Sequence, residues 1–483
     1  MNDALVAAAS LQPDEQARAA IRAYLAGVEP AIASSECGIW ADKVQILADA
    51  YAMGGVKRVL WEYDLMADDL DLAALMAQDD GTEPRAPELN TSRALNPQLA
   101  LDQGATDEGN AQCLLSMFGR EFVYTRAYGY LWWTGTHWTD EGAEESLGRA
   151  ATHVLKQRYM IAARANAARQ RSYEHIMRAS LPTARHVRDC LYLFRLYIAA
   201  DIQRFDASPD LLNCANGVLD LATGALTPHS SSQRFTYCLP VEYQPDADQT
   251  LWRNFIASVV GGGEEVADYL QLAVGYSLTG YTREECLFYI NGPTRSGKGT
   301  FTETLLAMLP KPIAMEVDFT TFTADRGADT QNFDLAPLKP ARLIIASESN
   351  KYQALNTGKI KSLTGGNEVY CALKHRDHFS YRPQYKMWLV SNHPVNADVD
   401  DDALWYRVKV IEFPNSFAGH EDTSLKHRMR AADTLRGVLA WAVEGAKRWF
   451  ALGPKGLRPV EPQIIGDVTV RQRAELDFVQ AWI

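Results

Sequence analysis

The stretch LFYINGPTRSGKGTFTETLLAML, residues 287–309, decides the fold. An apolar, strand-like run at Leu287–Ile290 leads into the loop pattern G-x-x-x-x-G-K, and a helical pattern follows from about Gly299 to Leu309. Between a strand and a helix, the glycines of such a loop let backbone N–H groups curl around a phosphate, and the N-terminus of the helix adds a favourable dipole. The stretch therefore predicts a nucleotide-binding P-loop.

The loop pattern assigns roles to single residues. Lys298 should neutralise the β- and γ-phosphates of a nucleotide. The position after this lysine, usually Ser or Thr, is Gly299, so Thr300 is the best candidate for Mg²⁺ ligation. The predicted nucleotide-binding residues are Gly292, Pro293, Thr294, Arg295, Ser296, Gly297, Lys298, Gly299 and Thr300. A chance glycine-rich turn is the alternative, and it leaves the pattern downstream unexplained.

Apolar runs alternate with helical patterns from Cys286 to Phe413. This alternation is typical of an α/β domain with a parallel sheet. The strand-like runs are Cys286–Ile290, Arg342–Ala346, Lys386–Val390 and Val408–Phe413.

Glu348 follows the second of these runs. An acid at the C-terminal end of a strand beside a phosphate loop can polarise the attacking water, so Glu348 is the predicted catalytic base. Many such ATPases carry two adjacent acids, but the first position here is Ser347. The Mg²⁺ shell would then depend on Thr300 and on Glu348 through water. Asp334, in a loop, is a weaker candidate acid.

Two further polar residues flank the later strands. Asn392 follows the run 385–391, where an amide is suited to hold the γ-phosphate or the lytic water; a plain Asn-His-Pro turn is the alternative. Arg407 directly precedes the last run and is suited to act on a neighbouring subunit's nucleotide as an arginine finger. The alternative for Arg407 is a salt bridge with the adjacent run Asp400–Asp402.

Five stretches, in this order, resemble the superfamily 3 helicases, and more narrowly the primase-helicases of phages, plasmids and poxviruses. They are GPTRSGKGTF (292–301), LIIASESN (343–350), KIKSLTGGNEV (359–369), LVSNHPVN (389–396) and LWYRVKVIEFP (404–414). Upstream, EGNAQCLL (108–115), the Trp-rich stretch 122–138 and LLNCANGVLDLATGAL (211–226) resemble the N-terminal accessory domain of that family. The resemblance covers about residues 105–480.

The resemblance implies an AAA+-like ATPase that uses ATP and Mg²⁺ and assembles as a hexameric ring. Such a ring translocates 3′ to 5′ on single-stranded DNA and unwinds forked DNA during replication of a phage or mobile element, with primase and polymerase as possible partners. Its ATP site lies between subunits. Lys298, Glu348 and Asn392 would act within one subunit, and Arg407 would reach into the next.

The family also has a DNA-gripping β-hairpin after its L-T-G-G motif. Residues 369–379 alternate apolar positions and then turn basic, as a hairpin with a charged tip would. Lys374 and Arg376, with His375 third, are therefore expected to contact DNA phosphates, which hold DNA without reading its sequence. An ordinary solvated hairpin tip is the alternative.

The predicted fold is an α/β P-loop (AAA+-like) ATPase domain with a parallel sheet, preceded by an α+β accessory domain and an acidic helical N-terminal region. The predicted segments are an acidic helical region (1–80), a linker (81–105), the accessory domain (106–245), a helical collar or linker bundle (246–282), the superfamily 3 ATPase domain (283–450) and a C-terminal tail (451–483) leading toward an absent or truncated winged-helix domain. The only D-x-D of the first 104 residues, Asp69–Asp71, is typical of a solvated acidic helix, so primase activity is not expected.

The net charge of −12 argues at first against nucleic-acid binding, since such proteins usually carry a basic footprint. Residues 1–104 hold 17 acidic and 7 basic residues, however, and the remaining chain holds 43 and 41. Residues 151–204 hold ten basic and three acidic residues, so this helical segment faces either nucleic acid or solvent. The tryptophans of 122–138 likewise either stack on bases or form a small core.

No run approaches the roughly 18 apolar residues of a membrane helix, and the first residues lack the pattern of a secretory signal. The seven cysteines form no C-x-x-C pair, which favours buried thiols in a reducing cytosol. The resemblance to phage proteins implies the cytoplasm of a host cell, with a bacterial host expected. Two alternatives to a helicase remain. One is a nucleotide-dependent origin-binding initiator or protein-remodelling AAA+ ATPase without unwinding activity, and the other is a non-catalytic structural ring.

Overall fold

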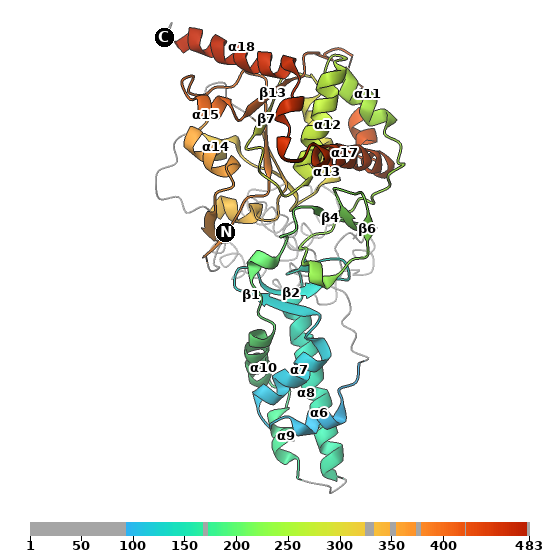
Figure 1. Ribbon diagram of the computed structural model, residues 1–483. Helices are drawn as coiled ribbons and strands as arrows, with labels where there is room; N and C mark the ends of the chain where they lie inside the picture. Colours follow the sequence, from blue (N-terminus) through green and yellow to red (C-terminus); the bar gives the residue numbers. More distant parts are fainter. Residues whose placement is uncertain are drawn as a thin grey trace, which may run out of the picture. The chain divides into compact units, whose positions relative to one another are not determined.

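The computed structural model describes residues 93–167, 172–323, 333–347, 354–372, 378–420 and 422–480. The chain divides into two compact units, Met1–Arg85 and Ala86–Ile483, and every described residue belongs to the second (Figure 1). The predicted acidic region 1–80 and most of the predicted linker lie outside the described residues.

Five parallel strands form the central sheet, in the order β13-β7-β12-β9-β8. Their bounds are β7 Leu287–Asn291, β8 Ala314–Glu316, β9 Leu343–Ser347, β12 Lys386–Ser391 and β13 Val408–Glu412. The predicted parallel sheet and four of its strands are confirmed. The sequence gives no sign of β8 because three residues are too few to show a periodic pattern.

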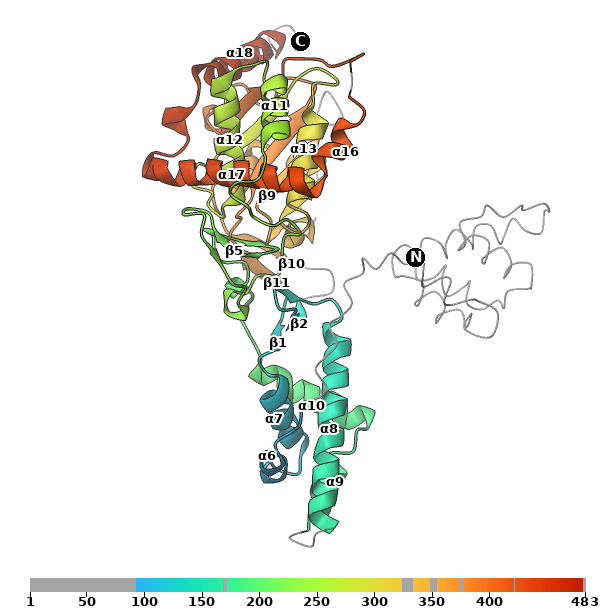
Figure 2. The same cartoon turned by 90° about the vertical axis from the view of Figure 1, so that its right-hand side faces the viewer.

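Helices cover both faces of this sheet (Figures 1 and 2). Alternate strand side chains point to opposite faces, so Phe288 and Trp388 enter one core while Leu287 and Leu389 enter another. The first core holds α11 Thr250–Val259, α12 Glu264–Leu278, α13 Lys298–Met308 and α17 Ala432–Leu452; the second holds α14 Thr357–Thr364, α15 Asp402–Trp405 and part of α18 Gln463–Gln480. Segment 246–282, expected to form a separate bundle, therefore supplies α11 and α12 to the first core.

Two small antiparallel sheets precede this domain. They comprise β1 Phe122–Thr125, β2 Gly129–Trp133 and β3 Trp138–Thr139, and β4 Leu211–Cys214, β5 Gly217–Asp220 and β6 Leu226–Thr227. Trp132 and Trp138 are buried, and their indole N–H groups donate to the carbonyls of Glu141 and Ser231 at 3.0 and 2.9 Å. The base-stacking hypothesis is therefore wrong for these two tryptophans, which belong to the core.

Five helices form what we call the helical layer: α6 Pro97–Asp102, α7 Asp107–Phe118, α8 Ala143–Ala167, α9 Glu174–Ala179 and α10 Ala184–Tyr197. Its fully buried Arg158 donates to the Ala100, Gln103 and Gly104 carbonyls and to the Asn110 amide oxygen, at 2.7 to 3.1 Å. These bonds satisfy the carbonyls at the end of α6. Helix α6 itself falls inside the predicted linker.

A buried polar cluster ties the segment before β4 to the amino edge of the central sheet. Lys339 and Arg342 donate to the carbonyls of Phe205 and Ser208 at 2.6 and 2.8 Å. Burial raises the pKa of the neighbouring Asp206, and the charges of Lys339 and Arg342 oppose that rise. No helix in the described ranges is both long and apolar enough to cross a membrane.

Candidate nucleotide-binding site

The predicted P-loop, Gly292–Gly297, connects β7 to α13 at the carboxyl edge of the central sheet. The register pairs Asn291 of β7 with Ser391 of β12, and Ser347 of β9 with Val390 of β12. The carboxyl ends of all three strands therefore lie together beside the loop, which is where open α/β sheets bind ligands.

Both glycines of the motif are required by the structure. A Cβ atom on Gly292 would lie 2.3 Å from the carbonyl oxygen of Phe413. Gly297 has φ of 92°, and a Cβ atom there would lie 2.6 Å from a methyl group of Val259. The loop thus adopts a backbone path that only glycine permits at these two positions.

Lys298 opens α13 and turns its side chain back into the loop. Its ammonium group donates to the carbonyls of Gly292 and Pro293 at 2.7 and 2.8 Å and to the Ser296 hydroxyl at 3.1 Å. The side chain is buried, and burial lowers the pKa of its ammonium group. No carboxylate among the described residues pairs with it, so within these ranges no acidic side chain neutralises the positive charge of the loop.

The segment after β13 braces the loop from outside. The Ser416 hydroxyl donates to the Thr294 carbonyl at 3.0 Å, and the backbone N–H of Phe417 donates to the Arg295 carbonyl at 2.9 Å. The Asn415 side chain anchors the segment to α11 by donating to a carbonyl at 2.9 Å. These residues belong to no motif recognised in the sequence. The only sequence feature that could have indicated them is a cluster of polar residues directly after a buried strand.

The first turn of α13 offers a hydroxyl for Mg²⁺. Thr300 is half-buried, and its hydroxyl has no hydrogen-bond partner among the described residues. Glu303, one turn on, is already held by Lys426 and Arg430 at 2.6 and 2.7 Å. Mg²⁺ in nucleotide sites takes few protein oxygens beside phosphates and water, so a single free hydroxyl fits that need. No cluster of three or more His, Cys, Asp or Glu side chains suited to a metal occurs within the described ranges.

The turn that carries Asn392 is fixed to β7. The His393 N–H donates to the Ser391 hydroxyl at 2.8 Å, and the His393 carbonyl accepts from the Tyr289 hydroxyl and the Asn291 amide at 3.0 and 2.6 Å. Asn392 itself is exposed at the carboxyl edge, the same edge as the loop. The structure thus brings Asn392 and the P-loop to neighbouring strand ends.

Gln472 of α18 connects this turn to β7 through hydrogen bonds that no sequence motif predicts. Its side chain is buried; the amide nitrogen donates to Asn291 Oδ1 at 3.2 Å, and the amide oxygen accepts from the Val395 N–H at 3.2 Å. One glutamine therefore joins the last helix, the end of β7 and the segment after Asn392. No local sequence signal marks it, because its partners lie more than 70 residues away.

Several predicted residues lie outside the described ranges. Glu348 is one of them, and Lys374, His375 and Arg376 are the others. The backbone of Asp334 is described, within the 3-10 segment Phe333–Leu338, but its side chain is not. The strands on either side of the predicted hairpin tip are present: β10 Val369–Ala372 pairs antiparallel with β11 His378–Tyr381.

Arg407 lies at the opposite edge of the sheet from the P-loop. Its carbonyl accepts from the Leu287 N–H at 2.9 Å, so Arg407 stands at the amino end of β7, about 16 Å along the strand from the loop by the usual strand rise. Its guanidinium pairs with Glu285 at 2.7 Å. The structure therefore does not bring Arg407 to Lys298 of the same chain.

The aspartate run near Arg407 pairs with other cations. Asp401 binds Lys361 at 2.8 Å, and Asp402 binds Arg473 at 2.6 Å. The alternative prediction, a salt bridge from Arg407 to this run, is wrong because the closest acid in space comes from 122 positions upstream in the chain.

Two stretches of the described chain match family models, and the chain is similar to viral proteins named as helicases. Residues 111–261 match the family described as D5 N terminal like, and residues 290–407 match a family of unknown function, DUF5906. The chain is 25% identical over 307 residues to “Putative helicase L207/L206” of Acanthamoeba polyphaga mimivirus, covering 58% of this chain and 31% of that protein. It is 24% identical over 281 residues to “Putative helicase 022R” of Frog virus 3, covering 55% and 28%. These matches support a relationship to viral primase-helicases.

Another relative carries a different name. “Putative primase C962R” of African swine fever virus is 25% identical over 247 residues, covering 49% of this chain and 25% of that protein. The chain therefore matches about a third or less of the length of these relatives. The solved C-terminal region of NrS-1 aligns with a TM-score of 0.37 and 12% identity, covering 52% of this chain and 58% of that one, which is too low to establish a shared fold.

The two family matches of this chain divide at the central sheet. The D5-like match spans from α7 to the end of α11 and includes most of the helical layer and both small sheets. The second match begins at the end of β7, includes the P-loop and ends at Arg407.

Proposed function

We propose that this chain is an ATP-dependent DNA helicase of the superfamily 3 type, which forms a hexameric ring and translocates 3′ to 5′ on single-stranded DNA during replication. The observation that carries the proposal is the Lys298 loop, held at the carboxyl edge of a parallel sheet beside the turn that carries Asn392. The helicase names of the relatives support the same activity.

In the proposed reaction, the loop N–H groups and Lys298 bind the β- and γ-phosphates of ATP. Glu348 accepts a proton from water as the water oxygen attacks the γ-phosphorus, and the bond to the bridging oxygen breaks to release ADP and phosphate. Asn392 positions the water or the γ-phosphate. Thr300 would hold Mg²⁺, which supplies neutralising charge on the phosphates when bound.

Arg407 can act in this scheme only on another subunit's nucleotide, because β7 separates it from its own loop. Its side chain is 16% exposed and paired with Glu285, whose side chain is 47% exposed. The half-exposed carboxylate of Glu285 can turn to solvent when a phosphate of an adjoining subunit takes its place at Arg407. The geometry thus supports a site completed between subunits.

The proposed DNA grip is the β10–β11 hairpin. Its two strands lie between β9 and β12 in the chain, and Tyr381 of β11 is buried in the second core. The exposed Tyr370 is stacked on His378 with ring centres 5.2 Å apart. Lys374, His375 and Arg376 would contact phosphates at the tip. Phosphate contacts hold any sequence, as a translocating enzyme requires.

The deciding experiment compares Lys298→Ala with wild type and with Lys311→Ala, which removes an exposed lysine beyond the far end of the same helix. We expect Lys298→Ala to lose ATP hydrolysis and strand displacement on a forked duplex, and Lys311→Ala to retain both. Unwinding by Lys298→Ala at the wild-type rate would overturn the proposal. A primer-synthesis assay on the same preparation tests the expectation that primase activity is absent.

A second comparison separates a helicase from a DNA-independent remodelling ATPase. We expect the double variant Lys374→Ala/Arg376→Ala to lose the stimulation of ATPase activity by single-stranded DNA while still binding a fluorescent ATP analogue. An unchanged response to DNA argues for the initiator or remodelling function. Turnover that Glu348→Gln abolishes excludes a non-catalytic ring.

A further inference from the structure

The outer face of α10 presents basic and aromatic side chains to solvent. The exposed fractions are 80% for Arg185, 75% for Arg188, 53% for Tyr192 and 60% for Leu196. Spacings of three, four and four residues place these side chains on one face of the helix. A helix face that only contacts water is stabilised by exposed arginines. An exposed tyrosine and leucine beside those arginines add nothing to its solvation.

Tyr192 is held in place by a neighbouring cation. The guanidinium carbon of Arg195 lies 4.2 Å from the centre of the Tyr192 ring, and the same guanidinium lies 5.7 Å from the ring of Tyr124 on β1. A cation over an aromatic ring stabilises its orientation. The exposed tyrosine is therefore ordered before any partner arrives, which lowers the entropic cost of binding.

Positive charge dominates this face. Asp189 is the only acidic residue of α10, and it is shared by Arg185 at 3.6 Å and Arg188 at 3.1 Å. One carboxylate cannot neutralise two guanidinium groups. Arg195 adds a third positive charge to the helix and has aromatic rather than acidic neighbours.

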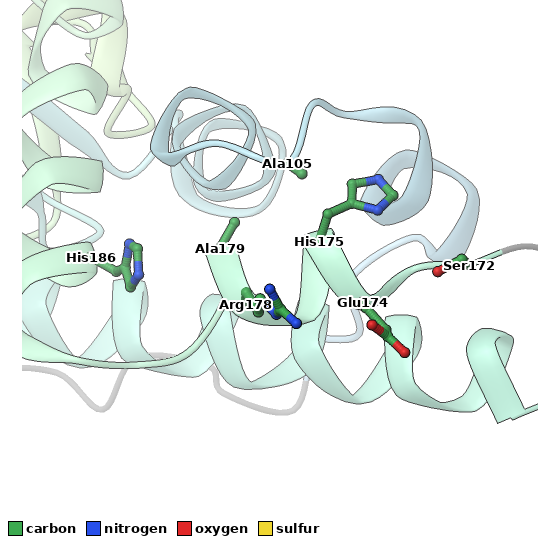
Figure 3. A pocket seen from close by; sticks show the side chains of 7 residues that line it. All are labelled: Ala105, Ser172, Glu174, His175, Arg178, Ala179 and His186. Carbon is green, nitrogen blue, oxygen red and sulfur yellow. The ribbon is translucent and has the colours of Figure 1, made fainter.

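A hollow at the start of α10 extends the basic face (Figure 3). It has a volume of about 560 Å³ and is lined by Ala105, Ser172, Glu174, His175, Arg178, Ala179 and His186. The Arg178 side chain lies between His186 and Glu174 (Figure 3), and it makes no ion pair with any residue of the described ranges. His186 contacts Asp107 at 2.8 Å, so Arg178 and His175 are left to meet an anion, which would bind on their side of the hollow, away from the Glu174 carboxylate.

We propose that the face formed by α9 and α10 binds single-stranded DNA outside the ring channel. Arg178, Arg185 and Arg188 would contact phosphates, and Tyr192 would stack on a base. Non-specific single-strand sites combine these two elements, a basic track and aromatic platforms. Arg185 and Tyr192 lie about 10 Å apart along the helix by its usual rise, a span that one or two nucleotides can bridge. The choice of DNA over RNA and the reference to a ring channel rest on the proposed helicase function.

The test measures binding of a fluorescent oligothymidine to the full chain without nucleotide, in wild type and in the Lys374→Ala/Arg376→Ala background, where the hairpin tip cannot mask the result. We expect Tyr192→Ala to weaken binding about tenfold, in the range of single stacked bases, and Tyr192→Phe to retain it. We expect Arg188→Glu to weaken binding and to reduce the slope of log affinity against log salt by about 0.7 or more, while Arg188→Lys retains both.

Asp189→Asn supplies a test in the opposite direction. It frees both neighbouring arginines from their shared carboxylate, so we expect severalfold tighter binding, which loss of structure cannot produce. Wild-type affinity in Arg188→Glu and Tyr192→Ala would overturn the proposal. A change in oligomer mass in these variants, without a change in DNA affinity, would also overturn it and would assign the face to protein contacts.

The outcome of this DNA-binding test does not depend on whether the chain is a helicase. Lys298→Ala should bind the oligonucleotide like wild type in this assay, because the P-loop is far from α10 in the chain and takes no part in nucleotide-free binding. If the wild-type protein has no ATPase activity, the helicase proposal is overturned, but the proposed DNA-binding face of α10 is not. Tighter binding to oligouridine than to oligothymidine would contradict the choice of DNA.

Discussion

Gln472 donates a hydrogen bond of 3.2 Å to Asn291, and this bond joins the last helix to the strand that enters the P-loop. The same glutamine accepts from the Val395 N–H just beyond the Asn392 turn, and its side chain is buried. A buried amide with both ends satisfied fixes the relative positions of its partners. The C-terminal helix is therefore part of the frame of the nucleotide site.

We expect Gln472→Ala to lower the free energy of unfolding by about 1–3 kcal/mol, because it leaves the Asn291 oxygen and the Val395 N–H unpaired inside the protein. It should also lower kcat for ATP hydrolysis more than it changes KM, since the turn holding Asn392 loses a support. Urea unfolding and steady-state kinetics measure the two effects. Gln463→Ala, at an exposed position of the same helix, is the matched control. Equal kinetics in both variants would contradict the expectation.

Two glycines of the predicted nucleotide-binding stretch, Gly292 and Gly299, should respond differently to substitution. Gly292→Ala places a methyl group 2.3 Å from the Phe413 carbonyl, so we expect loss of nucleotide binding. A Cβ atom on Gly299 meets only a Glu303 oxygen at 3.7 Å, so Gly299→Ser should fold normally. Its new hydroxyl stands at the usual Mg²⁺ position, and half-maximal ATPase activity should occur at a lower Mg²⁺ concentration. An unchanged Mg²⁺ requirement would argue against that placement of the ion.

The separation of Lys298 and Arg407 by the length of β7 predicts complementation between subunits. Lys298→Ala and Arg407→Ala should each lack ATPase activity alone. When the two proteins are mixed, some interfaces combine an intact Lys298 with an intact Arg407, so activity should reappear. ATPase titration at constant total protein measures this recovery. If every mixing ratio stays inactive while mixed oligomers form, Arg407 does not serve the neighbouring site.

We expect the stability of the small sheets to depend on pH through His137. Burial, with the nearby His229 second, lowers the pKa of His137 below its usual value of 6.5. The unfolded chain then binds the proton more readily, so this contribution to stability is complete above pH 6.5 and is lost as the pH falls from there through the folded pKa. Urea unfolding between pH 8 and 5 should show the loss, and His137→Asn should reduce its slope. The same slope in both proteins would refute the assignment.

Much of the central sheet could be predicted because parallel strands buried on both faces are nearly continuous apolar runs. The strand β7, the loop and α13 follow directly from one 23-residue stretch. Helix α6 was missed because Pro97 suggests a linker, whereas the proline occupies the first turn and Asn96 caps the helix by accepting from two backbone N–H groups. Proline at the start of a helix and proline in a linker look alike without the neighbouring chain.

The sequence predicts those residues of the candidate site that are marked by the strand or loop next to them. It does not predict contacts between residues that are far apart in the chain. Lys298 and Asn392 are marked by their own strands. The partners of Arg407 and Gln472 are not, because Glu285 and Asn291 meet them only after the sheet and α18 have assembled. Polar contacts of this range have no period in the sequence.

The position of β12 has a mechanical consequence. This strand is six residues long, is flanked by β7 and β9, and has no exposed residue. The β10–β11 hairpin precedes the beginning of β12 in the chain, and Asn392 follows the end of β12. The strand β12 therefore separates the hairpin from Asn392 by about 20 Å. The ladders to β7 and β9 hold β12 on both sides, so this strand fixes the distance between the base of the hairpin and the turn beside the phosphate loop.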